Sequence, residues 1–238
     1  MILTLPDAPE EEIGGKGAGL ARLMRLGLPV PAALVVPVSD RGRLQDPEGL
    51  VRSLGERLAV RSSAVGEDGS DRSAAGQFMS LMGVRPSDVP GAVGRVFRSA
   101  GSDRARVYRG NGSVDMAVIV QREVPATKAG VAFSRDPLTG SDDVVVECVF
   151  GHGERLVSGE VNADRYRVGR DGTVRARLMK GPPHELLRSL RDDEAREVAE
   201  LTRSAEEGFG RPIDVEFCFD TGGVWLVQAR PITTLGSG

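Results

Sequence analysis

Hydrophobic and polar residues alternate in two segments near the end of the chain, residues 213–217 and 224–231. A period of two residues predicts a strand with one face buried and one face polar. Gly222-Gly223 lies between the two segments and favours a tight turn. The sequence therefore predicts a β-hairpin at this place.

Four polar side chains of this hairpin are expected on one face. Asp214 and Glu216 come from the first strand, and Gln228 and Arg230 come from the second. Carboxylates suit Mg²⁺, which binds through one or two of them together with substrate phosphates. Arginine suits a pair of phosphate oxygens. A solvated hairpin face with a surface ion pair explains the same pattern, and the hairpin alone does not decide between the two interpretations.

Elsewhere the periodicity changes between that of helices and that of strands, which indicates a mixed α and β architecture. The helices are expected over 15–26, 46–54, 89–99, 103–108 and from Pro183 to about Glu207. Strands are expected through Val36, over 58–64, between 113 and 150, and in a second hairpin over 165–168 and 173–179.

A glycine-rich segment, Gly14-Gly15-Lys16-Gly17-Ala18-Gly19, opens the first helix. Backbone N–H groups and the helix dipole attract anions at such a start. Lys16 would add a point charge for a phosphate. The spacing is not that of a Walker A motif. A flexible turn before a helix is the alternative interpretation.

Two further segments have the composition of ligand-binding loops. The strand that ends in Arg61-Ser62-Ser63 precedes a small, polar, glycine-bearing loop over 66–77, which includes Gly76. Such a loop can approach phosphates closely and close as a lid, or it can be an exposed connector. The strand over 116–120 runs into Gln121 and Glu123, where backbone groups can meet a purine edge or simply end a strand.

Taken in order, these segments resemble the ATP-binding domain of the phosphoenolpyruvate synthase and pyruvate phosphate dikinase family, which rifampin phosphotransferases also carry. The matching segments are GGKGAGLARL, LAVRSSAVGED, AAGQF, MAVIVQREV, GVAFSRDPLTG, ECVFGHGERLVSGEVNADRYRV, IDVEFCF and VWLVQARPITT. The resemblance implies an α+β ATP-grasp fold in which two lobes bind ATP in the cleft between them. We expect a shortened N-terminal lobe over 1–115, a C-terminal lobe over 116–234 and a tail over 235–238.

The resemblance also implies roles for the cationic residues. Lys16 and Arg61 would bind the ATP phosphates, and Arg230 would hold the γ-phosphate end. These three are the expected catalytic residues. Gly76 would belong to the lid loop over the phosphates.

The remaining implied roles concern the nucleoside and the metal. Gln121 and Glu123 fall in the segment that meets adenine and ribose. Glu216 and Gln228 would contact both Mg²⁺ and the phosphates, with Asp214 alongside them at the metal.

The implied activity is the transfer of phosphate from Mg-ATP to a histidine carrier or to a small molecule, with release of AMP and phosphate. The Thr-Ser-His carrier motif of the family is absent, and His152 and His184 are expected in a loop and at a helix start. Because this motif is absent, we expect the carrier or a substrate-binding protein on a separate chain. The segment between Val38 and Leu58 is also shorter than in the family, which is why we expect a shortened N-terminal lobe. The alternatives are an ADP-forming ATP-grasp kinase or ligase, and a regulatory ATP-binding module without catalysis.

Composition and charge bear on the partners, the location and the cysteine chemistry of the protein. The net charge is −3, with 31 basic and 34 acidic residues, which does not favour a nucleic-acid partner. Lysine occurs only at Lys16, Lys128 and Lys180.

We find no signal peptide and no segment that could span a membrane, and we expect a cytoplasmic protein with a natural start at Met1. Cys148 and Cys218 lie in apolar strand patterns and are expected to be buried without a disulfide.

Overall fold

The computed structural model describes residues 2–46, 49–66, 79–99, 115–151, 163–177 and 188–232. The chain divides into two compact units, of which unit 1 is Met1–Arg25 with Pro31–Glu123 and unit 2 is Leu26–Val30 with Val124–Gly238. The boundary follows the strand that the sequence analysis assigned to the C-terminal lobe, β5 (Met116–Arg122). The reason is that β5 pairs with two strands of unit 1.

Unit 1 is a five-stranded sheet with the order β1-β2-β5-β3-β4. The strands are β1 (Leu3–Thr4), β2 (Ala33–Val36), β3 (Leu58–Ala64) and β4 (Ser80–Val84), with β5 in the centre. Every neighbouring pair is antiparallel. The helical elements are α1 (Glu10–Arg25), α2 (Leu50–Ser53) and α3 (Val89–Ser99), with 3-10 turns at Val38–Asp40 and Pro86–Asp88.

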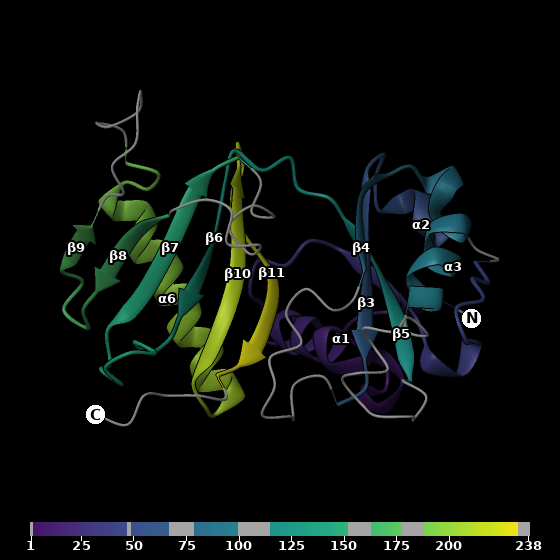
Figure 1. Cartoon of the computed structure of the whole chain (residues 1–238), viewed down its shortest axis with the longest axis horizontal. Coiled ribbons are helices and arrows are strands. Elements are labelled where there is room, and N and C mark those ends of the chain that lie inside the picture. The colour runs from purple at the N-terminus through teal and green to yellow at the C-terminus, as the bar shows by residue number, and fades with distance from the viewer. Residues whose placement is uncertain are drawn as a thin grey trace. The chain divides into compact units, whose positions relative to one another are not determined.

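The core of unit 1 follows from the alternation of its strands. One face of the sheet packs against α2 and α3, as Figure 1 shows. The residues of this cluster include Leu34, Val36, Leu58, Val60, Val118, Val120, Val51, Val89, Ala92, Val93 and Val96. Residues one position along each strand point to the opposite face.

Unit 2 is a six-stranded antiparallel sheet with the order β11-β10-β6-β7-β8-β9. The strands are β6 (Lys128–Phe133), β7 (Val144–Phe150), β8 (Asp164–Val168), β9 (Val174–Arg177), β10 (Ile213–Asp220) and β11 (Gly223–Pro231). Helix α6 (Asp192–Phe209) crosses this sheet (Figure 1). It buries Ala195, Val198, Ala199, Thr202, Ala205 and Phe209.

Helix α6 begins later than the sequence predicted. Residues 188–191 are not helical, and 183–187 lie outside the described residues. The Arg191 backbone N–H donates to Glu194 Oε2 over 2.8 Å, which satisfies a donor just before the first turn. Asp192, Asp193 and Glu194 then place three carboxylates at the positive end of the helix dipole. Leu190 is fully buried although it lies outside the helix, so this apolar residue marks a position in the core and not a turn of helix.

Most other elements agree with the periodicity. The helix at Val89–Ser99, the two predicted hairpins and the strands between 113 and 150 are confirmed. Strand β4 was not predicted, because its sequence does not alternate regularly between apolar and polar residues. In addition, Gly83 within the strand adopts φ 67°. The expected helix over 103–108 falls outside the described residues.

Two expectations from composition can be compared with the structure. Cys148 and Cys218 are buried, as predicted, and neither forms a disulfide. Burial raises the pKa of the Cys148 thiol to about 12, so this thiol is not poised to react. Among the described helices, none has both the length and the apolar run needed to cross a membrane.

Gly130 on β6 provides a test of the unit 2 sheet. A Cβ atom at Gly130 would lie 2.1 Å from the Glu147 carbonyl oxygen and 2.6 Å from Phe217 Cζ. We expect Gly130→Ala to lower the free energy of unfolding by about 1–3 kcal/mol, because the clash involves backbone that cannot turn away. Urea denaturation followed by the fluorescence of the single tryptophan, Trp225, measures this change in unit 2.

The control is Gly91→Ala in α3, where a Cβ atom would meet nothing within 4 Å. This substitution should raise the free energy of unfolding by about 0.5–1 kcal/mol through the greater helix propensity of alanine, measured by circular dichroism. An unchanged stability in Gly130→Ala would contradict the described register of β6 and β7.

Candidate functional site

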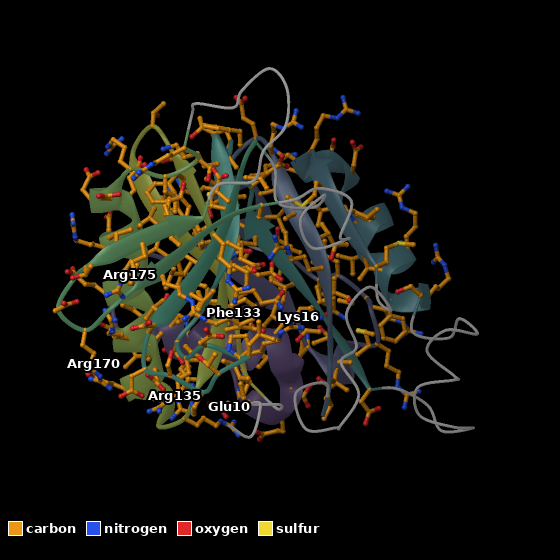
Figure 2. The ribbon with its side chains drawn as sticks, turned by 60° about the vertical axis from the view of Figure 1, so that its left-hand side comes forward. Glu10, Lys16, Phe133, Arg135, Arg170 and Arg175 are labelled. Carbon is orange, nitrogen blue, oxygen red and sulfur yellow. The ribbon has the colours of Figure 1, made fainter. Side chains whose placement is uncertain are left out.

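Helix α1 is interrupted at the glycine-rich segment. Gly14 has φ 66° and ψ 177°, which is not helical, so the helix begins again at Gly15. A Cβ atom at Gly14 would lie 2.3 Å from the backbone oxygen of Ser63. Glycine is therefore required here both by the backbone conformation and by the close approach of β3. Lys16 follows two residues later, near the start of the helical segment (Figure 2).

Ser63 joins the two ends of this interruption. Its hydroxyl donates to the Ile13 carbonyl oxygen over 2.6 Å and accepts from the Gly17 N–H over 3.0 Å. Ser63 is fully buried. The Arg-Ser-Ser segment and the glycine-rich segment were predicted as separate features from the sequence, and no role was predicted for Ser63.

Arg61 lies on the same strand as Ser63. The side chains of residues 61 and 63 share one face of β3, because successive residues of a strand alternate. Val60 packs in the core on the other face, whereas Ser63 contacts the start of α1. Lys16 and Arg61 are therefore both on the α1 side of the unit 1 sheet. Both side chains are partly exposed.

Gln121 and Glu123 have well-defined contacts within unit 1. Gln121 is 1% exposed, and its Nε2 donates to the Pro31 carbonyl oxygen over 3.4 Å. Glu123 Oε2 accepts from the Gly83 N–H over 2.5 Å, and Oε1 lies 3.7 Å from Arg57 Nε. These contacts hold the ends of strands together. A role of the two side chains at adenine or ribose stays a prediction.

In unit 2, the pairing of β10 and β11 places the four polar hairpin residues on one face. Asp214 is opposite Arg230, and Glu216 is opposite Gln228. Directly opposite residues of an antiparallel pair point to the same side of the sheet. The convergence that the alternation predicted is therefore present in the fold.

The hairpin differs from the prediction in one respect, which is a β-bulge. The register shifts after the Glu216–Gln228 pair, so that Phe217 is opposite Leu226 and Val227 is the extra residue. Strict alternation would have put Leu226 on the polar face. The bulge moves it to the opposite face, where Phe217 and Leu226 are 1% and 0% exposed.

Asp214 and Arg230 form a close ion pair. Arg230 Nε lies 2.9 Å from both carboxylate oxygens of Asp214, whose side chain is 10% exposed. Asp214 therefore orients the guanidinium of Arg230. Its carboxylate is committed to that contact, which makes Asp214 a weaker candidate for the metal than Glu216.

Glu216 and Gln228 supply the oxygen atoms that fit Mg²⁺ best in this hairpin. They form one cross-strand pair, with one carboxylate and one amide. Within the described ranges, no group of three or more His, Cys, Asp or Glu side chains could hold a metal ion. A single carboxylate with an amide suits a Mg²⁺ that arrives with nucleotide phosphates, since Mg²⁺ retains waters and uses few protein ligands.

The same face of the unit 2 sheet continues through β6, β7 and β8. The cross-strand pairs Asp214–Phe133, Phe133–Val145 and Val145–Arg167 follow one another across it. Figure 2 labels Phe133 on β6, and it also labels Arg135, Arg170 and Arg175 of unit 2.

Asp136 is a buried carboxylate that the sequence analysis did not identify. It is 0% exposed and forms ion pairs with Arg167, and with Arg165 Nη2 at 3.8 Å. The Leu138 N–H donates to Asp136 Oδ1 over 2.9 Å. Burial alone would raise the pKa of Asp136, but the hydrogen bonds from Leu138 and Thr139 and the charge of Arg167 outweigh burial and lower it.

The signal for this structural role was present in the sequence. Asp136-Pro137 starts the turn that ends at Gly140, and the side chain of an aspartate in this position commonly caps the backbone two residues later. Gly76, which the resemblance assigns to a lid loop, and both histidines, His152 and His184, lie outside the described residues.

The chain matches a known protein family. Residues 41–238 match the family described as "Pyruvate phosphate dikinase, AMP/ATP-binding domain". The chain is also similar to a prodigiosin synthesizing transferase of Serratia marcescens, with 32% identity over 93% of this chain and 32% of the relative. A rifampicin phosphotransferase of a Streptomyces species is 34% identical over 94% of this chain and 34% of that protein.

A probable phosphoenolpyruvate synthase of Methanocaldococcus jannaschii is 30% identical over 94% of this chain and 26% of its own length. The chain thus spans about a quarter to a third of these relatives. The alignment with the Methanocaldococcus jannaschii protein extends over 305 positions, which exceeds the 238 residues of this chain. The relative therefore has internal stretches that this chain lacks.

Solved structures identify the fold. A D-alanine–D-alanine ligase of Bacillus anthracis is similar with a TM-score of 0.50 and 9% identity, over 93% of this chain and 61% of that one. A Pyrococcus horikoshii protein is similar with a TM-score of 0.50 and 11% identity, over 93% of both chains. The fold is α+β ATP-grasp, as the sequence analysis expected.

The lowered pKa of Asp136 leads to a prediction about pH. A carboxylate whose pKa is lower in the folded state contributes stability above its unfolded pKa and loses it as the pH falls through the folded pKa. We expect Asp136→Asn to lower the free energy of unfolding at neutral pH by about 2 kcal/mol, because Arg167 loses its buried partner. The difference in the free energy of unfolding between the variant and the unchanged protein should narrow as the pH falls below 3.8, the ordinary pKa of an aspartate side chain. Urea denaturation at several pH values measures both effects.

The control is Asp142→Asn, since Asp142 is 51% exposed and pairs with Arg135 and Arg170 at the surface. Such pairs contribute about 0–1 kcal/mol. A difference for Asp136→Asn that does not change with pH would show that the carboxylate is not the source of the stability.

Proposed function

Because the chain belongs to the pyruvate phosphate dikinase AMP/ATP-binding domain family, we propose that it is the ATP-binding component of a phosphotransferase. In the proposed reaction, Mg-ATP is cleaved to AMP, one phosphoryl group passes to the acceptor, and the other passes to water and is released as inorganic phosphate. The acceptor would be a histidine of a carrier protein or a small molecule. The observation that carries this proposal is the group of Asp214, Glu216, Gln228 and Arg230 on one sheet face.

Phosphoryl transfer needs positioning and charge neutralisation more than covalent chemistry from the protein. The charged residues of the two units suit that requirement. Lys16 and Arg61 offer cations on the α1 side of the unit 1 sheet, and Arg230 offers a guanidinium that Asp214 keeps oriented. We propose that these three cations bind ATP phosphates.

The metal would be held by Glu216 and Gln228, and bound Mg²⁺ would neutralise phosphate charge. The amide and the carboxylate are opposite each other on paired strands, so both oxygen atoms can point to one position. Asp214 would act through Arg230. Gln121 and Glu123 would lie near adenine and ribose, and Gly76 would belong to the lid.

The names of the relatives support an acceptor that varies. One is named for prodigiosin synthesis, one for rifampicin and one for phosphoenolpyruvate. The part of each relative that aligns with this chain is 30–34% identical to it. The common part then supplies the step common to all of them, which we propose is the use of ATP. A partner on a separate chain, and residence in the cytoplasm where ATP is made, are parts of this proposal.

The binding site can be tested with three variants. We expect Lys16→Ala and Arg61→Ala each to weaken the binding of ATP about tenfold or more, because each removes a charged contact to phosphate. We expect Glu216→Gln to weaken mainly the additional affinity that Mg²⁺ provides. Isothermal titration calorimetry with ATP, with and without Mg²⁺, measures both.

The matched control is Arg52→Ala. Arg52 is an exposed arginine on α2, which packs on the other face of the unit 1 sheet. Its loss should leave ATP affinity unchanged. The site assignment is wrong if Lys16→Ala and Arg61→Ala bind ATP as tightly as Arg52→Ala does.

The reaction type can be tested from its products. We expect AMP and inorganic phosphate when the chain is incubated with Mg-ATP and a phosphohistidine-carrier protein, and little turnover without the carrier. Phosphorus NMR distinguishes the products. ADP from the chain alone would instead indicate a kinase or ligase. Tight ATP binding with no turnover in the presence of a carrier would contradict the proposed transfer and favour a regulatory module.

A further inference from the structure

The interruption of α1 is closed by a side chain from another part of unit 1. In an uninterrupted helix the Gly17 N–H would donate to the carbonyl oxygen four residues earlier, which is that of Ile13. Gly14 lies between these two groups and has φ 66° and ψ 177°, which is not helical. The Ser63 hydroxyl lies between them, because it donates to Ile13 O and accepts from Gly17 N. One hydroxyl thus links the two groups that a regular helix would join directly.

Lys16 lies inside the loop that this hydroxyl closes. The bridge spans residues 13 to 17, so it fixes the backbone on both sides of Lys16. The close approach is confirmed by Gly14, where a Cβ atom would lie 2.6 Å from Ser63 Oγ. Ser63 is 0% exposed, and no water is needed to explain its contacts, since the hydroxyl uses its single donor and one acceptor position.

Strand β3 therefore determines the position of two cations. Arg61 projects from β3 itself, and the backbone of Lys16 is tied to the same strand two residues further along. A side chain that binds phosphate must be held to well within an ångström of its productive position for full effect. Side chains on a central strand are better fixed than side chains on a glycine-rich segment, which has many accessible conformations when it is untied.

We propose that Ser63 is a positioning residue for Lys16, holding the glycine-rich helix start in the geometry in which Lys16 binds ATP phosphate. This inference rests on the proposed function of Lys16. It assigns Ser63 no contact with ATP. Loss of the hydroxyl would free the segment around Lys16, and the loss of affinity would therefore require the lysine to be present.

A double-mutant cycle tests this dependence. The four proteins are the unchanged chain, Ser63→Ala, Lys16→Ala and the variant with both substitutions, and the measured quantity is the dissociation constant of Mg-ATP by titration calorimetry. We expect Ser63→Ala to weaken binding about tenfold in the presence of Lys16 and by less than about twofold in its absence. A purely structural role would lower the melting temperature equally in both backgrounds, and it would weaken binding equally in both.

Ser62→Ala is the matched control. Ser62 is the neighbouring serine and is 1% exposed, and it lies on the other face of β3 from Ser63. Its truncation removes a buried hydroxyl of the same strand without touching the start of α1. It should leave Mg-ATP affinity within about twofold of the unchanged protein.

A second pair of variants applies if Ser63→Ala does not fold. Ser63→Thr and Ser63→Val have nearly the same shape, so any cost of the added methyl group is shared, and only threonine retains the hydroxyl. We expect the threonine variant to bind Mg-ATP about tenfold more tightly than the valine variant. Equal affinities of this pair would overturn the inference.

The outcomes separate the two proposals. If Lys16→Ala weakens binding and Ser63→Ala does not, the role of Ser63 is wrong and the nucleotide site stands. If Ser63→Ala weakens binding equally with and without Lys16, Ser63 does not act through the lysine. If Lys16→Ala binds Mg-ATP like the unchanged protein, the proposed site itself is wrong, and the inference about Ser63 falls with it.

Discussion

The alternation of side chains across antiparallel strands is the constraint on which both units depend. Each unit has an apolar sheet face covered by helices, by α2 and α3 in unit 1, where α1 packs against the opposite face, and by α6 in unit 2. Once that face is apolar, every second residue must point the other way. The candidate site residues that lie on strands, such as Arg61 and Glu216, occupy these positions. A shift of one residue in register would exchange core and site, so the core that stabilises the fold also determines where the polar groups lie.

The bulge in β11 shows how closely the two requirements are linked. The hairpin needs Gln228 and Arg230 on one face and Leu226 on the other, and their spacing in the sequence does not permit this in a regular strand. One extra residue, Val227, reverses the alternation between the two groups. The sequence predicted the hairpin and the convergence of its polar residues. It did not predict the bulge, because a bulge is decided by the packing of Phe217 and Leu226 and has no pattern of its own in the sequence.

The sequence was informative where the signal is local and limited where it is not. Periodicity predicted α3 and the hairpins, since these depend on neighbouring residues. Strand β4 depends on pairing with β3, and the start of α6 depends on the hydrogen bond between Arg191 and Glu194. The contact of Ser63 with Gly17 joins positions 46 residues apart. Both segments were recognised as unusual, but their contact can be known only from the fold. The same holds for the buried pair of Asp136 and Arg167.

Unit 1 and unit 2 present their charged groups in different ways, and the difference has a physical reason. In unit 2 the ion pair of Asp214 and Arg230 lies on paired strands, where the ladder of backbone hydrogen bonds already fixes both residues. In unit 1 Lys16 lies in a segment of glycines, whose backbone would lose much entropy on being ordered. Glycine is nevertheless needed at position 14, because any side chain would collide with Ser63. The residue that excludes a side chain from Gly14 is thus the one whose hydroxyl links Ile13 to Gly17. Close approach and rigidity at Lys16 have one origin, and neither can be changed without the other.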